Sequence, residues 1–212
     1  MKTLNKKHLF AALILNIIIV FMEIVGIILS VCKHGLGVFQ FYTENSNYFA
    51  LIASLLFCLS CVRAINKSTP LPQYIHVLRF VSASSLTITF FIVLTVIIPV
   101  NPSSFTEMIF MGSNIFHHVL CPILSFISFV WLESEIQISK TSLLAILIPT
   151  IVYGIICIIL NILKIIVGPY PFFFVYAMPW YFVILALVGV LAVVLGLSIF
   201  VLWLRNKQAR KG

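Results

Sequence analysis

Long apolar runs dominate the chain, and short polar or proline-bearing segments separate them. Each run is long enough to cross about 30 Å of hydrocarbon as an α-helix. The separating segments are too short to fold alone, so we expect residues 1–212 to form a single integral membrane domain of the all-α class. The pattern predicts a bundle of six transmembrane helices at residues 9–31, 39–62, 75–99, 107–131, 142–167 and 179–204.

The composition agrees with this pattern and excludes a water-soluble protein. Hydrophobic residues make up 62% of the chain and charged residues only 8%. Ordinary globular proteins contain about 25% charged residues. A soluble domain could not cover its surface with so few charges, so we expect a multi-pass protein in contact with membrane lipids.

Positive charge is distributed unevenly between the two ends of the predicted bundle. One end of the bundle has only Lys33, together with Lys164 near a helix end. The opposite end has most of the positive charges, and we expect the side chain of Arg79 to extend along its helix to the surface at that end. That basic end receives Lys2, Lys6, Lys7, Arg63, Lys67, Lys140, Arg205, Lys207, Arg210 and Lys211. Because cytoplasmic segments are enriched in Lys and Arg, both termini are expected in the cytoplasm. The net charge of +8 then reflects topology and contact with anionic lipids, and does not indicate nucleic-acid binding.

Two adjacent histidines, His117 and His118, interrupt the fourth apolar run. Ionisable side chains in hydrocarbon usually face a bundle interior or a wet cavity, so the pair is a candidate functional site. His118 lies one helical turn after Asn114 and one turn before Pro122, on the same face. Pro122 has no amide for the carbonyl of residue 118, which requires protein or trapped water nearby. The structural alternative is that the histidines hydrogen-bond neighbouring helices.

A second polar cluster, TENSN at residues 43–47, lies near the outer end of the second run. Thr43, Ser46 and Asn47 are three and four residues apart and therefore share one helix face. A structural explanation is that these side chains satisfy the free amides of a helix N-terminus at the membrane interface. A functional explanation requires this cluster to meet the histidines of the fourth run.

Together the two clusters have the residue types of an acyl-transfer site. A threonine hydroxyl is a poor nucleophile unless a base takes its proton, and neutral imidazole is the commonest base. Thr43 would attack an ester carbonyl, and His118 would transfer the proton. Asn47, Ser46 or Asn114 could donate to the oxyanion, or Asn114 could orient the imidazole. The chain has no aspartate, so we expect a dyad, helped by an asparagine or by Glu23.

These motifs resemble those of a known family. FYTENSN at residues 41–47 is similar to the Y/F-T-x-x-S-N signature that opens the second helix of small bacterial six-helix membrane proteins. HVLCP at 118–122, followed by Trp131, resembles their H-x-x-x-P element, and YPF at 170–172 resembles their Y-P-F element. These bacterial proteins resemble the eukaryotic androgen-induced protein family, which includes the androgen-dependent TFPI-regulating protein.

The resemblance extends over nearly the whole chain in helix count and motif order. It implies an intramembrane threonine hydrolase that acts on fatty acid esters of hydroxy fatty acids, here in a bacterial plasma membrane. It implies Thr43 as the nucleophile and His118 as the catalytic histidine. His117 stays an alternative base, because the histidine-to-proline spacing of the eukaryotic pattern is one residue longer.

Glu23, deep in the first run, supports a rival interpretation. It shares a helix face with Asn16, and we expect it to pair with a histidine, to line a cavity or to bond a neighbouring helix as a lone acid. Glu23 and the histidine pair would form the polar relay of a small non-enzymatic transporter or channel. The sequence shows no inverted repeat or paired broken helices of the usual transporter kind. A scaffold or sensor without turnover is the third interpretation.

No cofactor, metal site or disulfide is predicted. Cys58 and Cys61 form a C-x-x-C without a second pair, and the five cysteines are expected to behave as small hydrophobic residues. Zinc-helix and phosphate-loop motifs are absent. The aromatic segment 170–180 resembles an interfacial belt or a short lid that gates the substrate. The sequence leaves the substrate and the oligomeric state open.

Overall fold

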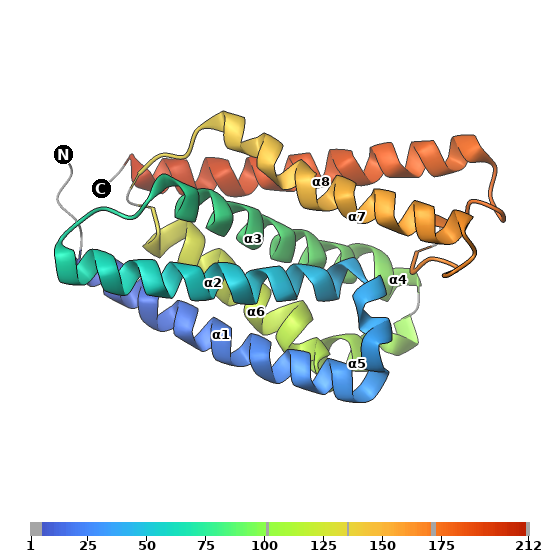
Figure 1. Ribbon diagram of the computed structural model, residues 1–212, viewed down its shortest axis with the longest axis horizontal. Helices are drawn as coiled ribbons and strands as arrows, with labels where there is room; N and C mark the ends of the chain where they lie inside the picture. The colour runs from blue at the N-terminus through green and yellow to red at the C-terminus, as the bar shows by residue number, and fades with distance from the viewer. Residues whose placement is uncertain (1–5, 101, 135, 171–172, 211–212) are drawn as a thin grey trace.

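The computed structural model describes residues 6–100, 102–134, 136–170 and 173–210, which form helices joined by short loops (Figure 1). No β-strand occurs in these ranges. Six helical segments are long and apolar enough to cross a membrane, which confirms the predicted fold class. These spans are Lys6–Gln40, Tyr42–Lys67, Gln73–Val100, Ile115–Leu132, Lys140–Ile162 and Trp180–Arg210.

Helix α3 lies at the centre of the bundle. It contacts α2 and α6 on one side and α7 and α8 on the other, whereas α1 packs against α2 and α6. Helices α7 and α8 form an outer pair along one side (Figure 1). As a result, α3 is the most buried span, and α7 and α8 are the least buried. The bounds are α1 (Lys6–His34), α2 (Tyr42–Lys67), α3 (Gln73–Ile92), α6 (Cys121–Ile127), α7 (Leu143–Ile162) and α8 (Trp180–Ala209).

The two ends of the bundle differ in character. The first turn of α1 and the last turn of α8 lie at one end, which we call the basic end because it includes Arg63 and Lys67 (Figure 1). The short helix α5 (Phe105–Phe110) and the start of α2 lie at the opposite end, which we call the α5 end. An even number of spans places both termini of the helical region on the same side.

The fourth predicted span, residues 107–131, is not one continuous helix. Helix α5 ends where Met111 is extended, and Gly112 follows with a φ of +58° that glycine tolerates easily. The fourth span then begins with a π-helical turn, η4 (Ile115–Leu120), which leads into α6. This wider turn lies directly before Pro122, which has no amide to continue regular α-helical bonding.

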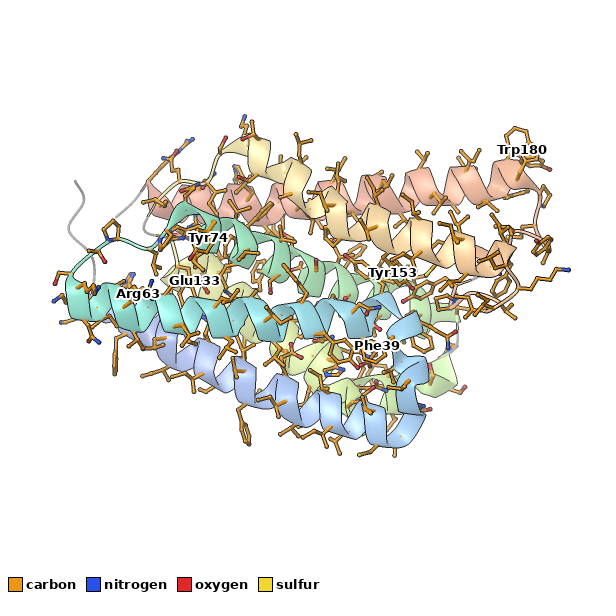
Figure 2. All side chains as sticks on the ribbon, viewed as in Figure 1. Phe39, Arg63, Tyr74, Glu133, Tyr153 and Trp180 are labelled. Carbon is orange, nitrogen blue, oxygen red and sulfur yellow. The ribbon has the colours of Figure 1, made fainter. Side chains whose placement is uncertain are left out.

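A buried ion pair joins Arg79 of α3 to Glu133, which follows span four. Glu133 lies towards the basic end of the bundle (Figure 2). The Arg79 Nη2 to Glu133 Oε1 distance is 2.9 Å, and the Nε to Oε2 distance is 3.1 Å. Ser128 and Asn16 also donate to the Glu133 carboxylate, at 2.7 and 3.2 Å. The expectation that Arg79 extends to the basic surface is therefore wrong. Its charge is matched inside the bundle, where it connects α1, α3 and span four.

Arg205 of α8 was expected among the surface charges, and it too is fully buried. Its Nη2 donates to the backbone carbonyl of Glu133 at 2.7 Å and lies 3.3 Å from His76 Nδ1. Its Nη1 donates to the carbonyl of Ile136 at 2.6 Å. These bonds fasten α8 to the segment that also holds Arg79.

Glu133 lies just outside the membrane-spanning segment, and its ionisation follows from its partners. Burial alone would raise the pKa of this carboxyl group. The charge of Arg79 and the hydrogen bonds from Arg79, Ser128 and Asn16 outweigh that effect and hold the pKa of Glu133 below its usual range. Glu133 is therefore ionised at neutral pH.

Replacing Glu133 by alanine leaves Arg79 buried without its carboxylate partner. Breaking a buried ion pair in this way typically costs about 3–5 kcal/mol, so Glu133→Ala should strongly lower the thermal unfolding midpoint of the detergent-solubilised protein. Glu107→Ala is the matched control, because it breaks an exposed pair with Lys33 (3.2 Å) that contributes about 0–1 kcal/mol. Equal effects of the two substitutions would contradict this role for the buried pair.

Candidate functional site

Two cavities meet near the α5 end of the bundle. The polar cavity, of about 410 Å³, lies between the last turns of α1, the start of α2, α5 and η4. Its walls include the side chains of Ser30, Lys33, Glu44, Glu107 and His118. Residues with hydroxyl, ammonium, carboxyl and imidazole groups therefore line one shared space.

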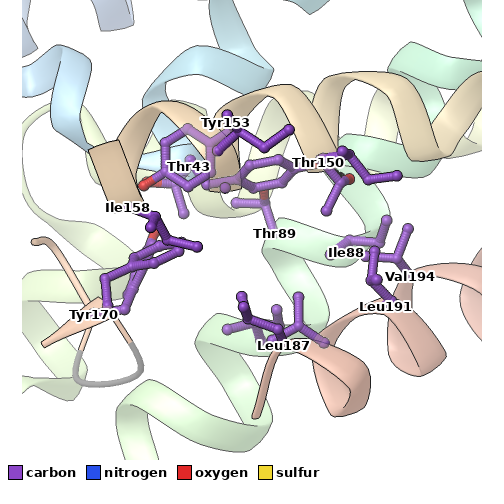
Figure 3. Close-up of a pocket in the computed structure, with 17 residues that line it drawn as sticks. Thr43, Ile88, Thr89, Thr150, Tyr153, Ile158, Tyr170, Leu187, Leu191 and Val194 are labelled. Carbon is purple, nitrogen blue, oxygen red and sulfur yellow. Dashed lines mark hydrogen bonds between the residues drawn. The ribbon is translucent and has the colours of Figure 1, made fainter. Parts of the chain in front are cut away.

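The apolar cavity, of about 220 Å³, lies between α2, α3, α7 and α8 (Figure 3). Its walls are largely aliphatic and include Ile88, Leu187 and Leu191. Thr43 and Tyr170 line both cavities, and Figure 3 shows them at the same end of the apolar one. These two residues thus mark the junction between an apolar and a polar compartment.

Thr43 is the second residue of α2, and its side chain is half-buried. The N-cap of α2 is Phe41, whose side chain makes no capping hydrogen bond. Ser46 Oγ and Asn47 Nδ2 instead donate to the Thr43 carbonyl at 2.8 and 2.7 Å. Of the two explanations for this cluster, capping of free amides does not describe Ser46 and Asn47, because their side chains donate to a carbonyl and fix the first turn of α2.

The side chains considered as oxyanion donors already donate hydrogen bonds to backbone carbonyls. Asn47 Nδ2 also points at the carbonyl of His117 at 3.3 Å, and the Ser46 hydroxyl donates within its own turn. Asn114 Nδ2 donates to the carbonyl of Glu107 at 3.0 Å and so closes the break between α5 and η4. All three residues brace the backbone of the site, and Asn114 does not orient an imidazole.

His118 lines the polar cavity together with Thr43. Its Nδ1 lies 2.9 Å from the carbonyl oxygen of Met108. A carbonyl oxygen can only accept a hydrogen bond, so Nδ1 must carry a proton, and Nε2 of the neutral ring has a free lone pair. The structure thus brings the predicted nucleophile and base to one cavity, although no hydrogen bond joins them in the part of the chain that it describes.

His117 has a different environment from its neighbour. Its Nδ1 lies 3.3 Å from Glu44 Oε1, and its Nε2 lies 3.7 Å from Glu23 Oε2. His117 and Glu23 are fully buried, and neither lines the two cavities. Of the three alternatives for Glu23, the structure shows contact with a histidine, and Glu23 does not line either cavity. We call Glu23, His117 and Glu44 the acid–histidine row.

Sequence reasoning did not single out Glu44 and Tyr170 as site residues. Glu44 follows Thr43 directly and is one of only five acidic residues, so its position inside an apolar run was an available signal. The contact of Tyr170 with Thr43 depends on how the loop before α8 folds back over α2. No sequence pattern indicates that contact.

Gly26 of α1 allows the His117 ring to pack directly against the α1 backbone. A β-carbon at Gly26 would lie 2.7 Å from His117 Cδ2 and 3.2 Å from Phe116 Cβ. The small residue therefore lets the imidazole sit between the carboxyl groups of Glu23 and Glu44.

We expect Gly26→Ala to displace the imidazole and to destabilise the protein by about 1–3 kcal/mol, the usual cost of overpacking. Gly196→Ala in α8 is the control, because its β-carbon would meet no atom within 4 Å. Alanine in a helix is favoured over glycine by about 1 kcal/mol. The thermal unfolding midpoints of the two variants should shift in opposite directions, and a more stable Gly26→Ala protein would disprove the tight packing.

The site has no arrangement typical of a bound metal. No group of three or more His, Cys, Asp or Glu side chains within the described ranges could hold a metal ion. All five cysteines are free thiols, and four of them are buried.

The chain was compared with protein-family models, with curated proteins and with solved structures. None of these three comparisons gave a match. The function of the two cavities therefore rests on their residues and geometry.

Proposed function

We propose that the protein is an intramembrane hydrolase that cleaves a lipid ester, such as a fatty acid ester of a hydroxy fatty acid. Thr43 is the nucleophile and His118 the general base. The main support is the position of Thr43 at the junction of an apolar and a polar cavity. A long-chain ester likewise joins an apolar acyl chain to a polar ester group. The motifs that resemble the androgen-induced protein family point to the same two residues.

The two cavities suit the two parts of such a substrate. The apolar cavity would bind the acyl chain, and its walls include α7 and α8, the least buried spans, so a lipid could enter from the bilayer. The ester carbonyl would then lie beside Thr43. The polar cavity would supply water and accept the alcohol that leaves.

His118 is better placed than His117 to act as the base. His118 lines the cavity that Thr43 also lines, and its Nδ1 bond to Met108 leaves Nε2 as a proton acceptor. Both ring nitrogens of His117 face carboxyl groups. A proton taken from Thr43 would therefore go to Nε2 of His118.

The reaction would follow the usual two steps of acyl transfer. The Thr43 oxygen attacks the carbonyl carbon, its proton passes to His118, and the C=O π electrons move to the oxygen. The tetrahedral intermediate then re-forms the C=O bond and breaks the bond to the alcohol oxygen, which takes the proton from His118. Water attacks the acyl-threonine in the same way and releases the carboxylic acid.

We further propose that the protein works in a bacterial plasma membrane with its basic end in the cytoplasm. The excess of Lys and Arg at that end supports this orientation. The polar cavity at the α5 end would then open towards the outer face of the membrane.

A fluorophosphonate probe tests the nucleophile and the base directly, because it forms a stable adduct with an activated hydroxyl. Thr43→Ala and His118→Ala should each abolish labelling of the purified full-length protein. The first variant lacks the attacking oxygen, and the second lacks the base that takes its proton. Labelling is measured as probe fluorescence after gel electrophoresis.

Thr87→Ala and His8→Ala are the matched controls. The Thr87 hydroxyl donates to the Ala83 carbonyl of its own helix at 2.7 Å, and His8 is exposed on the first turns of α1. Both controls should label like the wild type. Full labelling of the Thr43→Ala protein would exclude an acyl-threonine mechanism.

The acid–histidine row supports a second candidate function, proton-coupled transport. It leads from Glu23, which is sealed inside the bundle, through His117 to Glu44 at the wall of the polar cavity. Both carboxyl oxygens of Glu23 and Oε2 of Glu44 are buried, with Cys121 beside Glu23 and Ser30 beside Glu44. Intramembrane chains of carboxyl and imidazole groups are typical of proton relays.

Proton flux into proteoliposomes that contain a pH-sensitive dye tests this second candidate. If the row conducts, flux should exceed that of empty liposomes, and Glu23→Gln should abolish it because an amide cannot release the proton. His8→Ala should conduct like the wild type. Flux no greater than in empty liposomes would eliminate the transport candidate.

A further inference from the structure

Tyr170 lies in the loop between α7 and α8 and lines both cavities beside Thr43 (Figure 3). Its phenol group interacts with the Thr43 hydroxyl and with the backbone of Tyr42 and Thr43. A hydroxyl that can donate a hydrogen bond therefore stands directly beside the proposed nucleophile.

The loop holds this phenol in place through contacts on both sides of Tyr170. Asn161 Nδ2 donates to the Ile166 carbonyl at 3.2 Å, and the Val175 amide donates to Asn161 Oδ1 at 3.2 Å. The Tyr170 ring lies 6.3 Å from the ring of Phe173, which is buried. Tyr170 is thus positioned by packing and hydrogen bonds although it lies outside a helix.

A site for ester cleavage requires a donor for the negative oxygen of the tetrahedral intermediate. The side-chain amides of Asn47 and Asn114 and the hydroxyl of Ser46 are engaged with backbone carbonyls. The phenol of Tyr170 is hydrogen-bonded to the Thr43 hydroxyl itself, so it lies within reach of an oxyanion that forms on a carbonyl attacked by Thr43. Burial raises the pKa of Tyr170 to about 12, so the phenol keeps its proton at neutral pH and can donate.

We propose that Tyr170 is a further catalytic residue, whose hydroxyl donates a hydrogen bond to the oxyanion formed when Thr43 attacks a lipid ester. This inference rests on the proposed hydrolase function. As the new C–O bond forms, the C=O π electrons move to the carbonyl oxygen, which lies only two bonds from the Thr43 oxygen. The phenol turns from Thr43 to this oxygen and keeps its own proton. When the intermediate collapses, the charge and the hydrogen bond weaken together.

Tyr170→Phe removes only the hydroxyl and retains the ring that packs against Phe173. We expect the maximal rate of fluorophosphonate labelling of the full-length protein to fall about 10²–10³-fold, the usual effect of losing one oxyanion donor. The probe concentration at half-maximal rate and the thermal unfolding midpoint should stay near those of the wild type. A purely structural role would change these two quantities and not the maximal rate alone.

Tyr176→Phe is the matched control in the same loop, because its hydroxyl donates to the Ile162 carbonyl at 2.8 Å, away from Thr43. It should label at the wild-type rate. Wild-type labelling of Tyr170→Phe together with no labelling of Thr43→Ala would overturn the role of Tyr170 and leave the hydrolase proposal intact. Wild-type labelling of Thr43→Ala would overturn both.

A second variant keeps the test decisive if Tyr170→Phe does not fold. A fluorinated tyrosine in place of Tyr170 retains the ring and the hydroxyl but is a stronger hydrogen-bond donor. The protein with this residue should react with the fluorophosphonate probe faster than the wild type at the same pH. An unchanged rate would overturn the proposal.

Discussion

The buried ion pair between Arg79 and Glu133 constrains the register of the transmembrane helices relative to one another. Charges without partners are very unfavourable inside a membrane bundle, so these two side chains must meet and their hydrogen bonds must be satisfied. Asn16 and Arg205 attach α1 and α8 to the same glutamate. With the spans fixed in register at the basic end, the polar residues nearer the α5 end are fixed relative to one another as well.

At the α5 end, the break in span four determines where the histidines point. Gly112 allows the chain to turn after α5, and the π-helical turn before Pro122 widens the backbone around His117 and His118. The two neighbouring rings consequently meet different surroundings. His117 lies between two carboxyl groups, whereas His118 faces the polar cavity. Two histidines that are neighbours in the sequence thus lie in two different environments.

The junction between the apolar and polar cavities is the basis of the proposed ester hydrolysis. In the proposed hydrolase, the apolar cavity bordered by α7 and α8 would bind the lipid chain, and the polar cavity bordered by His118 would hold water and the leaving alcohol. Thr43 and Tyr170 stand where the two compartments meet. The hydrogen bonds of Ser46 and Asn47 to the Thr43 carbonyl hold the backbone at the proposed nucleophile, and in the proposed mechanism Tyr170 stabilises the developing charge.

The sequence by itself determined the six apolar spans, because crossing hydrocarbon requires long runs of apolar residues. It also located Thr43 and the histidine pair, since polar residues are rare and costly in such runs. It could not show that Arg79 and Arg205 are buried, because the same charges at helix ends also suit the membrane surface. Only the tertiary structure decided their partners, the separate environments of the histidines and the contact of Tyr170 with Thr43. Each of these depends on residues far apart in the chain, and their distance is set by helix packing and loop path, which no local pattern encodes.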